Sequence, residues 1–499
     1  MLDALLSFSL RQRLLSALAA VALAAAGTLA WLGLPIDAFP DVSTTQVKLV
    51  LKAPGMTPEE VETRITVPLE QELLGIPRQR MLRSTSKYAL ADVTLDFEDG
   101  TDVYWARQQV NERFSAVMAD LPPGTTGGLA PITTPLGEMF MFTLEGPQSL
   151  AERRRVLDAV VRPALRTLPG VADVNSLGGH VRTFEVEPDA AALAARGLSL
   201  QQLEEALAAS NRNDGAGRLA AGEEALIVRA EGAIRDLDDL GATVVRADAH
   251  GVVRVADVAT VRHGALTRYG AVTRDGRGEA VEGLVLGLRG ANARDVVAGV
   301  KARLREIAPA LPPGMAVVPF YDRSHLVDRA VSTVGKALTE AVVLVLVLLL
   351  AFLGNLRAAL VVAVMLPLSA LGTFALMKLT GLSANLMSLG GLAIAIGMLV
   401  DGAVVVVENV ETALTGPQAR HHSVLHLVYR AAREVIVPVA SGIAIIVIVF
   451  LPLLTLEGLE GKLFAPVALT IVYALVVSLL LSVTVVPVLA SWLLHKGEA

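Results

Sequence analysis

The amino-acid sequence predicts a polytopic α-helical membrane protein, with six transmembrane helices and one large α+β insert outside the cytoplasm. Of the 499 residues, 53% are hydrophobic and only 18% are charged, whereas a soluble domain carries about a quarter charged residues. The apolar residues gather in the first 35 and the last 165 positions. The stretch between them has the polarity of a soluble domain, which places a soluble insert between membrane segments.

The composition also excludes several classes of function. The chain has no cysteine, which rules out a disulfide framework, a thiolate metal site and a cysteine nucleophile. Its net charge of −6 argues against a nucleic-acid partner, because phosphate binding needs a basic face. The sequence contains no GxxxxGKS/T phosphate loop, GxSxG elbow or HExxH zinc pair. We therefore expect no enzyme active site, no cofactor and no nucleotide bound to this chain as an energy source.

The first transmembrane helix is expected within residues 1–36. Leu14 to Leu34 is a run of 21 residues without charge, which at about 1.5 Å per residue is long enough to cross the hydrocarbon core. The alternative is a cleaved signal peptide, since Arg11 and Arg13 precede the run. The apolar region of a signal peptide is usually only about 7–15 residues long, so the length favours a retained helix.

Residues 37–134 predict a first soluble module. Thr57-Pro58 opens a helix, because threonine is a good N-cap, proline suits the first helical position and two glutamates follow in the first turn. The other expected elements are the strands Gln46–Lys52, Arg83–Tyr88 and Ala91–Phe97 and the helix Val103–Met118. Strands and helices in this order predict a split βαβ, or ferredoxin-like, module.

A second module of the same kind is expected in two parts, residues 135–181 and 273–332. Its elements are the strand Met139–Leu144, the helix Leu150–Leu168, the strands Val171–Ser176 and Glu282–Leu288, and the helix Ala293–Leu311. Residues 182–272 interrupt it as an inserted subdomain with a helix over Ser199–Ser210. Pro68-Leu69 and Pro163-Ala164 stand at similar places in the two modules and indicate a loose internal repeat.

Five further hydrophobic segments lie within residues 333–499 and complete the six crossings. They are Ala337–Leu353, Ala358–Met377, residues 384–412, Val435–Leu456 and Leu463–Leu494. The basic residues that flank them on one side, with those before the first helix, are Arg11, Arg13, Arg357, Arg420, Arg430, Arg433 and Lys496. Positive charge accumulates in cytoplasmic loops. Both termini and the 413–434 loop are therefore predicted to be cytoplasmic, and residues 37–332 to lie outside the cytoplasm.

The most informative residues are Asp401, Glu408 and Asn409 in the segment 384–412, which together are the predicted proton relay. Asp401 follows an uncharged stretch from Leu382 to Val400, so it is expected well inside the bilayer, where a carboxylate costs about 2.5–3.5 kcal/mol. Glu408 comes seven residues later, almost two helical turns, which puts both acids on one face about 10 Å apart. A carboxyl group held in an apolar medium can exchange a proton when a conformational change alters its solvation. The alternative is that Asp401 is a satisfied interhelical hydrogen-bonding group and Glu408 lies near the cytoplasmic interface.

No lysine or arginine of this chain is expected in the middle of the membrane, because Lys336, Lys378 and Lys462 all fall at helix ends. A cationic partner for Asp401 would then come from a second chain. The run Gly390–Gly397 places small residues three to four apart. Such spacing allows close contact between helices in lipid, and it favours an Asp401 that faces another helix.

At these residues the chain resembles the heavy-metal efflux branch of the resistance-nodulation-cell division (RND) transporters, the cobalt-zinc-cadmium and copper-silver type of inner-membrane pump. The resemblance runs along the whole chain. Its segments are Pro35–Val42 (PIDAFPDV), Phe97–Arg113 (FEDGTDVYWARQQVNER), Tyr321–Arg329 (YDRSHLVDR), Ser383–Asn409 (SANLMSLGGLAIAIGMLVDGAVVVVEN) and Leu456–Pro466 (LEGLEGKLFAP).

The resemblance implies a proton antiporter that exports metal cations, with two periplasmic porter modules and a docking subdomain. It also implies a homotrimer in a bacterial inner membrane that is joined to a periplasmic adaptor protein and an outer-membrane channel. The proton-relay acids of the family fall here on Asp401 and Glu408. Met387 and Met398 resemble methionines that pass soft ions, since thioether sulfur prefers Cu(I) or Ag(I). The alternative for both methionines is ordinary packing in the membrane.

The chain departs from the family in two respects. Ala395 stands where zinc- and cobalt-type members often have a further acid, which puts selectivity for divalent cations in doubt. Family members are also about twice as long, so this chain resembles the amino-terminal half, and the family's lysine partner for the helix-four acid belongs to the other half. Either a second polypeptide completes the pump, or the chain is a truncated gene product or a fragment.

Two other readings stay open at this point: a proton-driven protein-translocation subunit, and an inactive remnant or scaffold. The histidines His421, His422 and His426 do not share one helical face, so a metal sensor in the 413–434 loop is not favoured.

Overall fold

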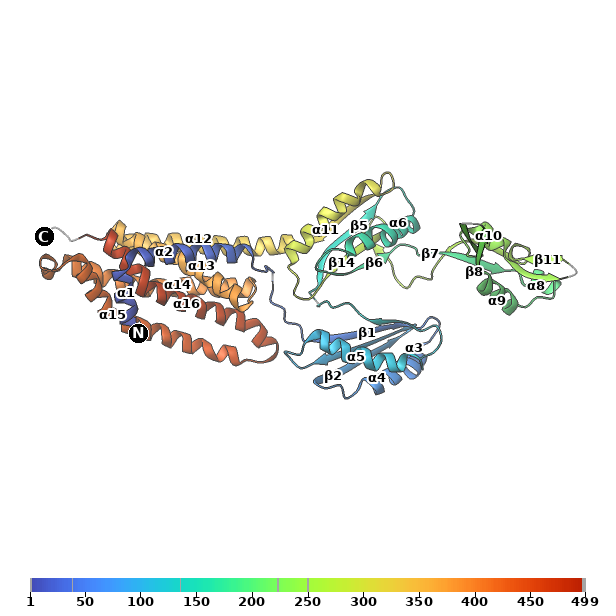
Figure 1. The fold of residues 1–499 in the computed structure, drawn as a ribbon, viewed down its shortest axis with the longest axis horizontal. Helices are drawn as coiled ribbons and strands as arrows, with labels where there is room; N and C mark the ends of the chain where they lie inside the picture. The colour runs from blue at the N-terminus through green and yellow to red at the C-terminus, as the bar shows by residue number, and fades with distance from the viewer. Residues whose placement is uncertain (1, 38, 135, 222–223, 249–250, 496–499) are drawn as a thin grey trace.

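The computed structural model describes residues 2–37, 39–134, 136–221, 224–248 and 251–495. Figure 1 shows a bundle of long helices at one end of an elongated molecule and a small α+β unit at the other. Two modules, each with a sheet and covering helices, lie between these ends.

Six helices in the described part of the chain are long and apolar enough to cross a membrane. They are α2 (Arg13–Leu32), α12 (Arg323–Leu353), α13 (Leu356–Thr380), α14 (Leu386–Thr415), α15 (Val424–Phe450) and α16 (Gly458–Leu493). Each predicted hydrophobic segment falls on one of them. The helix α12 begins at Arg323, well before the predicted Ala337, because hydropathy detects the apolar part of a helix and misses polar turns that continue it. A short helix, α1 (Leu2–Arg11), precedes α2 and was not predicted.

The basic chain segments lie together at the end of the bundle that is remote from the modules. Asp3 of α1 accepts a hydrogen bond from the Tyr429 hydroxyl at 2.9 Å and lies 3.3 Å from Arg433 of α15. Arg357, at the start of α13, contacts the His495 ring at 2.9 Å. The ends of the described chain and the starts of α13 and α15 are therefore on one side of the bundle.

The first module is a four-stranded sheet covered by two helical segments. Its elements are β1 (Gln46–Lys52), a broken helix of α3 (Pro58–Val61), a π-helical turn (Glu62–Thr66) and α4 (Val67–Leu73), then β2 (Gln79–Lys87), β3 (Leu90–Phe97), α5 (Val103–Met118) and β4 (Thr126–Leu129). The strand order is β2-β3-β1-β4. Val47, Leu49 and Leu51 alternate with exposed or half-buried neighbours along β1 and form the core with one face of each helical segment.

The second module has the same strand order. It consists of β5 (Glu138–Glu145), a broken helix of α6 (Leu150–Val156), a π-helical turn (Leu157–Val161) and α7 (Arg162–Arg166), then β6 (Val171–Gly178), β14 (Glu279–Gly287), α11 (Ala293–Ile307) and β15 (Ala316–Asp322). Its sheet runs β6-β14-β5-β15, with β13 (Val272–Thr273) also paired to β14. The strands β4 and β15 were missed: β4 contains two glycines, and β15 leads directly into a helix.

The loose internal repeat of the sequence has a structural counterpart. In each module the first helix changes to a single π-helical turn and then resumes with proline as its second residue, Pro68 in α4 and Pro163 in α7. Proline lacks an amide hydrogen and clashes with the carbonyl group four residues earlier. A π-helical turn before it relieves both problems without ending the helix.

The third unit comprises residues 182–265 and projects beyond the second module (Figure 1). The antiparallel pair β7 (Arg182–Pro188) and β12 (Ala259–Ala265) connects it to that module. It also contains α8 (Ala190–Ala195), α9 (Leu200–Ser210), the hairpin β8 (Asn213–Ala221) and β9 (Glu224–Glu231), α10 (Leu237–Ala242), and the pair β10 (Val244–Asp248) and β11 (Gly251–Arg254). Its core is small and includes Leu193, Leu203 and Val255.

The helix α14 occupies the middle of the bundle and packs most extensively against α16. A Cβ atom added at Gly391 would lie 2.7 Å from the carbonyl oxygen of Val467 in α16, so this close approach requires glycine. Gly390 and Gly397 face open space in the described chain. Of the predicted run of small residues, Gly391 therefore makes the close helix–helix contact.

Candidate proton-relay site in the helical bundle

The position of the predicted relay acids is set by how α14 begins. The side chain of Asn385 accepts hydrogen bonds from the amides of Met387 and Ser388, both at 3.0 Å, and so caps the helix. The helix then runs without interruption to Thr415. This regular path fixes the angular positions of Asp401 and Glu408.

Asp401 and Glu408 lie on the same, outward face of α14. The neighbouring Gly402, Ala403 and Val407 are buried in the bundle, whereas both acids are exposed in this chain. Neither carboxylate has a hydrogen bond or an ion pair within the described ranges. Asp401 therefore makes no interhelical hydrogen bond within the described residues of this chain.

Both acids open into a groove of about 670 Å³ between α14 and α12. Its described lining consists of Val345, Leu348, Gly397, Val400, Asp401, Val404, Glu408, Glu411, Thr412 and Thr415. Within this lining, three carboxylates face apolar side chains and hydroxyl groups, and no lysine or arginine approaches them. An unpaired carboxylate at such a place is costly in lipid, so the groove is the candidate site for the predicted relay.

Asn409 belongs to a different face of α14. Its side-chain amide donates to the carbonyl oxygen of Ala431 at 2.8 Å and to Glu434 at 3.5 Å, both on α15. The structure therefore brings Asp401 and Glu408 together and separates Asn409 from them. The residue that directly follows Glu408 is rotated by about 100° around the helix axis. The prediction grouped Asp401, Glu408 and Asn409 because they are close in sequence and did not take this rotation into account.

Met387 and Met398 are half-buried on α14, and Met398 packs against the core of the bundle. The spacing of 11 residues is close to three helical turns, so both methionines lie along one side of the helix. In the described part of the chain, no group of three or more histidine, aspartate or glutamate side chains is arranged to hold a metal ion. The rings of His422 and His426 lie 4.9 Å apart without such a third ligand.

Two contributors to the groove were missed from the sequence. Glu411 is half-buried, lines the groove and accepts a hydrogen bond from Asn355 at 2.9 Å. Val345 and Leu348 of α12 form the opposite wall. The spacing of Glu411 three residues after Glu408 was an available signal, but the pairing of α12 with α14 has no signal in a single sequence.

The apolar helices and the two soluble modules of one topology define an integral membrane protein with a large soluble part. The chain belongs to the AcrB/AcrD/AcrF family, whose sequence pattern matches residues 5–499. It is thus a member of the RND superfamily, and it corresponds to the amino-terminal half of its heavy-metal efflux relatives.

Individual relatives support this assignment. The chain is 41% identical to the cation efflux system protein CzcA of Alcaligenes sp. (strain CT14), over 100% of this chain and 48% of that protein. It is 37% identical to the cation efflux system protein CusA of Escherichia coli (strain K12), over 99% of this chain and 48% of that protein. A crystal structure of a heavy metal efflux pump superposes with a TM-score of 0.88 at 36% identity, covering 97% of this chain and 48% of that one. The chain therefore spans about half the length of the relatives that it matches.

Proposed function

We propose that the chain acts as the amino-terminal part of a proton-driven pump that exports heavy-metal cations across the bacterial cell envelope. The observation that carries this proposal is the pair Asp401 and Glu408, unpaired in a groove of the membrane bundle. The names of the relatives, which are cation efflux and heavy-metal resistance proteins, support the substrate class.

In the proposed mechanism the two acids of α14 are the proton relay. A proton that crosses the membrane gains about 2.3 kcal/mol per 100 mV. If α14 presents Asp401 alternately to a cationic partner and to water, protonation changes the preferred position of the helix. Asn409 holds α14 to α15 in this scheme and does not carry the proton. The described lining of the groove holds no lysine or arginine, so the scheme assigns the cationic partner to another chain.

The proposal includes the membrane arrangement. The six apolar helices are its membrane spans, with α1, the 413–434 loop and the carboxyl end in the cytoplasm and residues 37–332 in the periplasm. The two sheets are ferredoxin-like porter modules (residues 37–134, and 135–181 with 273–332), and residues 182–272 are the docking subdomain. The shared strand order of the sheets and the basic end of the bundle support this assignment. The working unit is a homotrimer that contacts a periplasmic adaptor and an outer-membrane channel.

The test is an isosteric neutralisation at the native locus of the source cell. Asp401→Asn removes the titratable group and retains its shape, so we expect metal tolerance to fall to the level of a strain without the pump. Glu460→Gln, at an exposed acid at the other end of the bundle, is the matched control and retains tolerance. Growth on silver, copper, zinc and cadmium salts is measured for each strain. Full tolerance in the Asp401→Asn strain refutes the relay.

A further inference from the structure

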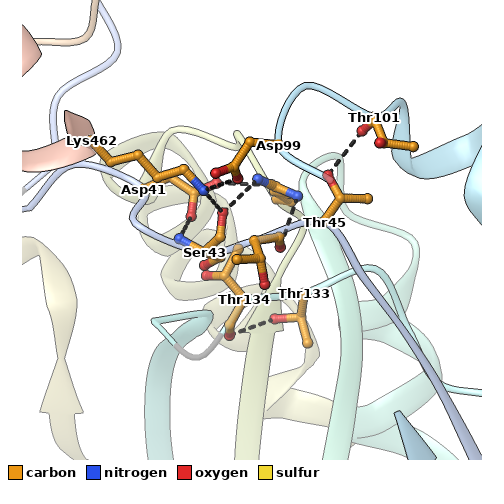
Figure 2. Close-up of polar contacts among 10 residues, drawn as sticks. Asp41, Ser43, Thr45, Asp99, Thr101, Thr133, Thr134 and Lys462 are labelled. Carbon is orange, nitrogen blue, oxygen red and sulfur yellow. Dashed lines mark hydrogen bonds and ion pairs between the residues drawn. The ribbon is translucent and has the colours of Figure 1, made fainter. Parts of the chain in front are cut away.

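Two of the sequence segments that carry the resemblance, Phe97–Arg113 and Leu456–Pro466, meet where the bundle joins the modules. Lys462, in the first turns of α16, extends toward Asp99 of the first module and toward Ser43 (Figure 2). Its Nζ atom lies 2.6 Å from Asp99 Oδ1 and donates to the carbonyl oxygen of Ser43 at 2.9 Å. The Lys462 side chain is 25% exposed and that of Asp99 is 40% exposed. A membrane helix thus makes a partly buried ionic contact with a soluble module.

A second cation holds the same stretch of chain from the other side. Arg289, which follows β14 in the second module, lies 2.8 Å from Asp41 Oδ2 and donates to the carbonyl oxygen of Ser43 at 3.2 Å. The Ser43 carbonyl therefore accepts hydrogen bonds from both cations. The adjoining Thr45 donates to the carbonyl oxygen of Thr101 at 2.9 Å (Figure 2), so this stretch is fixed to the first module where it enters β1.

The electrostatics of the stretch depend on these contacts. Burial by itself raises the pKa of Asp41, but hydrogen bonds from Ser43 and the charge of Arg289 outweigh it and hold that pKa below its ordinary value. Asp41 therefore stays ionised and keeps Arg289 in place.

Lys462 makes a polar link between the strands and helices of the first module, residues 46–129, and the membrane helices. Within the described residues, its contact with Asp99 is the hydrogen bond or ion pair that joins residues 46–129 to the bundle. Beside it, a cleft of about 1040 Å³ separates Gln79 and Glu98 of the module from Glu457 and Gly461 at the start of α16. The cleft leaves the module room to move, and Lys462 connects its two walls.

The helix α16, which carries Lys462, also contacts α14, the helix that carries the relay acids. Ser478 of α16 donates to the carbonyl oxygen of Leu399 in α14 at 3.2 Å. The contact of Gly391 with the backbone of Val467 removes any space between the two helices. Because closely packed helices move together, a displacement of α14 near Asp401 also displaces α16 and Lys462.

The second module is connected to the bundle in another way. The helix α12 begins directly after β15, and its first residue, Arg323, pairs with Asp37 at 2.8 Å. Movement of α12 therefore reaches the second module directly, because the chain continues from β15 into α12. The helix α16 is not adjacent in sequence to the first module, and the chain connects the two only through α12 or through α2 and the extended stretch after α2.

We propose that Lys462 is a positioning residue that transmits displacement of the α14–α16 pair to the first module through Asp99 and Ser43. The inference rests on the proposed function, because the displacement originates at the relay acids. It assigns to Asp99 in the FEDGTD segment and to Lys462 in the LEGLEGK segment a shared role in coupling the membrane bundle to one module.

The test uses the full chain in lipid nanodiscs. Because the chain has no cysteine, Ser115→Cys on α5 and Leu32→Cys at the end of α2 provide one pair of spin-label sites, both exposed. Pulsed EPR measures the distance distribution between the labels with Asp401 and with Asp401→Asn. We expect the Asp401 substitution to shift this distribution, and Lys462→Met to abolish the shift.

Two control variants separate transmission from a general loss of structure. Lys462→Arg keeps a cationic donor and should retain the shift. Lys378→Met removes another exposed lysine from the same side of the bundle and should also retain it. A merely structural role of Lys462 would lower the unfolding temperature but leave the shift in place.

Two outcomes overturn the inference: an equal shift in the Lys462→Met chain, or no shift in any background. Failure of the proposed function is recognised separately, by metal tolerance at the native locus. If Asp401→Asn abolishes tolerance while Lys462→Met retains it in full, the pump assignment stands and the coupling role of Lys462 is wrong.

Discussion

The ion pair between Arg323 and Asp37 provides a quantitative test of how α12 is fixed to the rest of the chain. The Arg323 side chain is 6% exposed and donates to Asp37 through Nε at 3.1 Å and Nη2 at 2.8 Å, and to the carbonyl oxygen of Leu136 through Nη1. Removing one partner of a buried ion pair costs about 3–5 kcal/mol. Because Asp37 is 28% exposed, water compensates part of the loss. We therefore expect Arg323→Met to destabilise the start of α12 by about 3 kcal/mol, the lower end of that range.

Hydrogen exchange with mass spectrometry measures this effect directly. Every 1.4 kcal/mol is a factor of ten in an equilibrium, so 3 kcal/mol raises exchange at the first turns of α12 by about 100-fold. Arg323→Lys keeps the charge but loses the forked geometry, and about 10-fold is expected, an intermediate effect. Arg329→Met, at an exposed arginine of the same helix, is the control and should leave exchange unchanged. An increase below about fivefold in Arg323→Met, or under about 1 kcal/mol, would refute the argument that this pair fixes α12.

Three further predictions concern the membrane helix α14 and the stretch after α2. Replacing Met387 and Met398 together by leucine should lower growth on silver and copper salts but not on zinc or cadmium salts, because thioether sulfur prefers soft monovalent ions. An equal loss of growth on all four salts would contradict a role of the two methionines in passing soft ions. Gly391→Ala should lower the unfolding temperature, since overpacking costs about 1–3 kcal/mol. Gly390→Ala is the control and should leave the unfolding temperature unchanged, because its added methyl group meets open space. Equal shifts of the unfolding temperature in the two variants would contradict the close contact at Gly391. The pKa of Asp41 is below its ordinary value of 3.8, so the ionised carboxylate stabilises the fold fully above pH 3.8, and this stabilisation is lost as the pH falls through the lowered pKa. Asp41→Asn should therefore remove this acid-induced loss of stability from a pH series of thermal unfolding. A pH series identical to that of the unmodified chain would contradict the prediction.

The local elements were predictable because each depends on a short stretch of sequence. The strand Gln46–Lys52 and the helix Val103–Met118 have the predicted bounds, since strand alternation and an N-cap such as Asp102 are visible within one element. Breaks within a helix were less accessible. The single predicted helix Leu150–Leu168 contains a π-helical turn before Pro163, because the chain accommodates the proline without ending the helix.

The sequence by itself determined that Asp401 and Glu408 share a face of one apolar helix, because the helical period fixes the angle between them. It did not determine what lies opposite that face. Only the tertiary structure decided that α12 and Glu411 complete the groove, that Asn409 turns toward α15, and that Lys462 meets Asp99 across 363 positions of the chain. The physical reason is that periodicity and capping act within a few residues. Contacts between distant segments instead follow from how all the helices and sheets pack at once, and no short stretch of sequence records that arrangement.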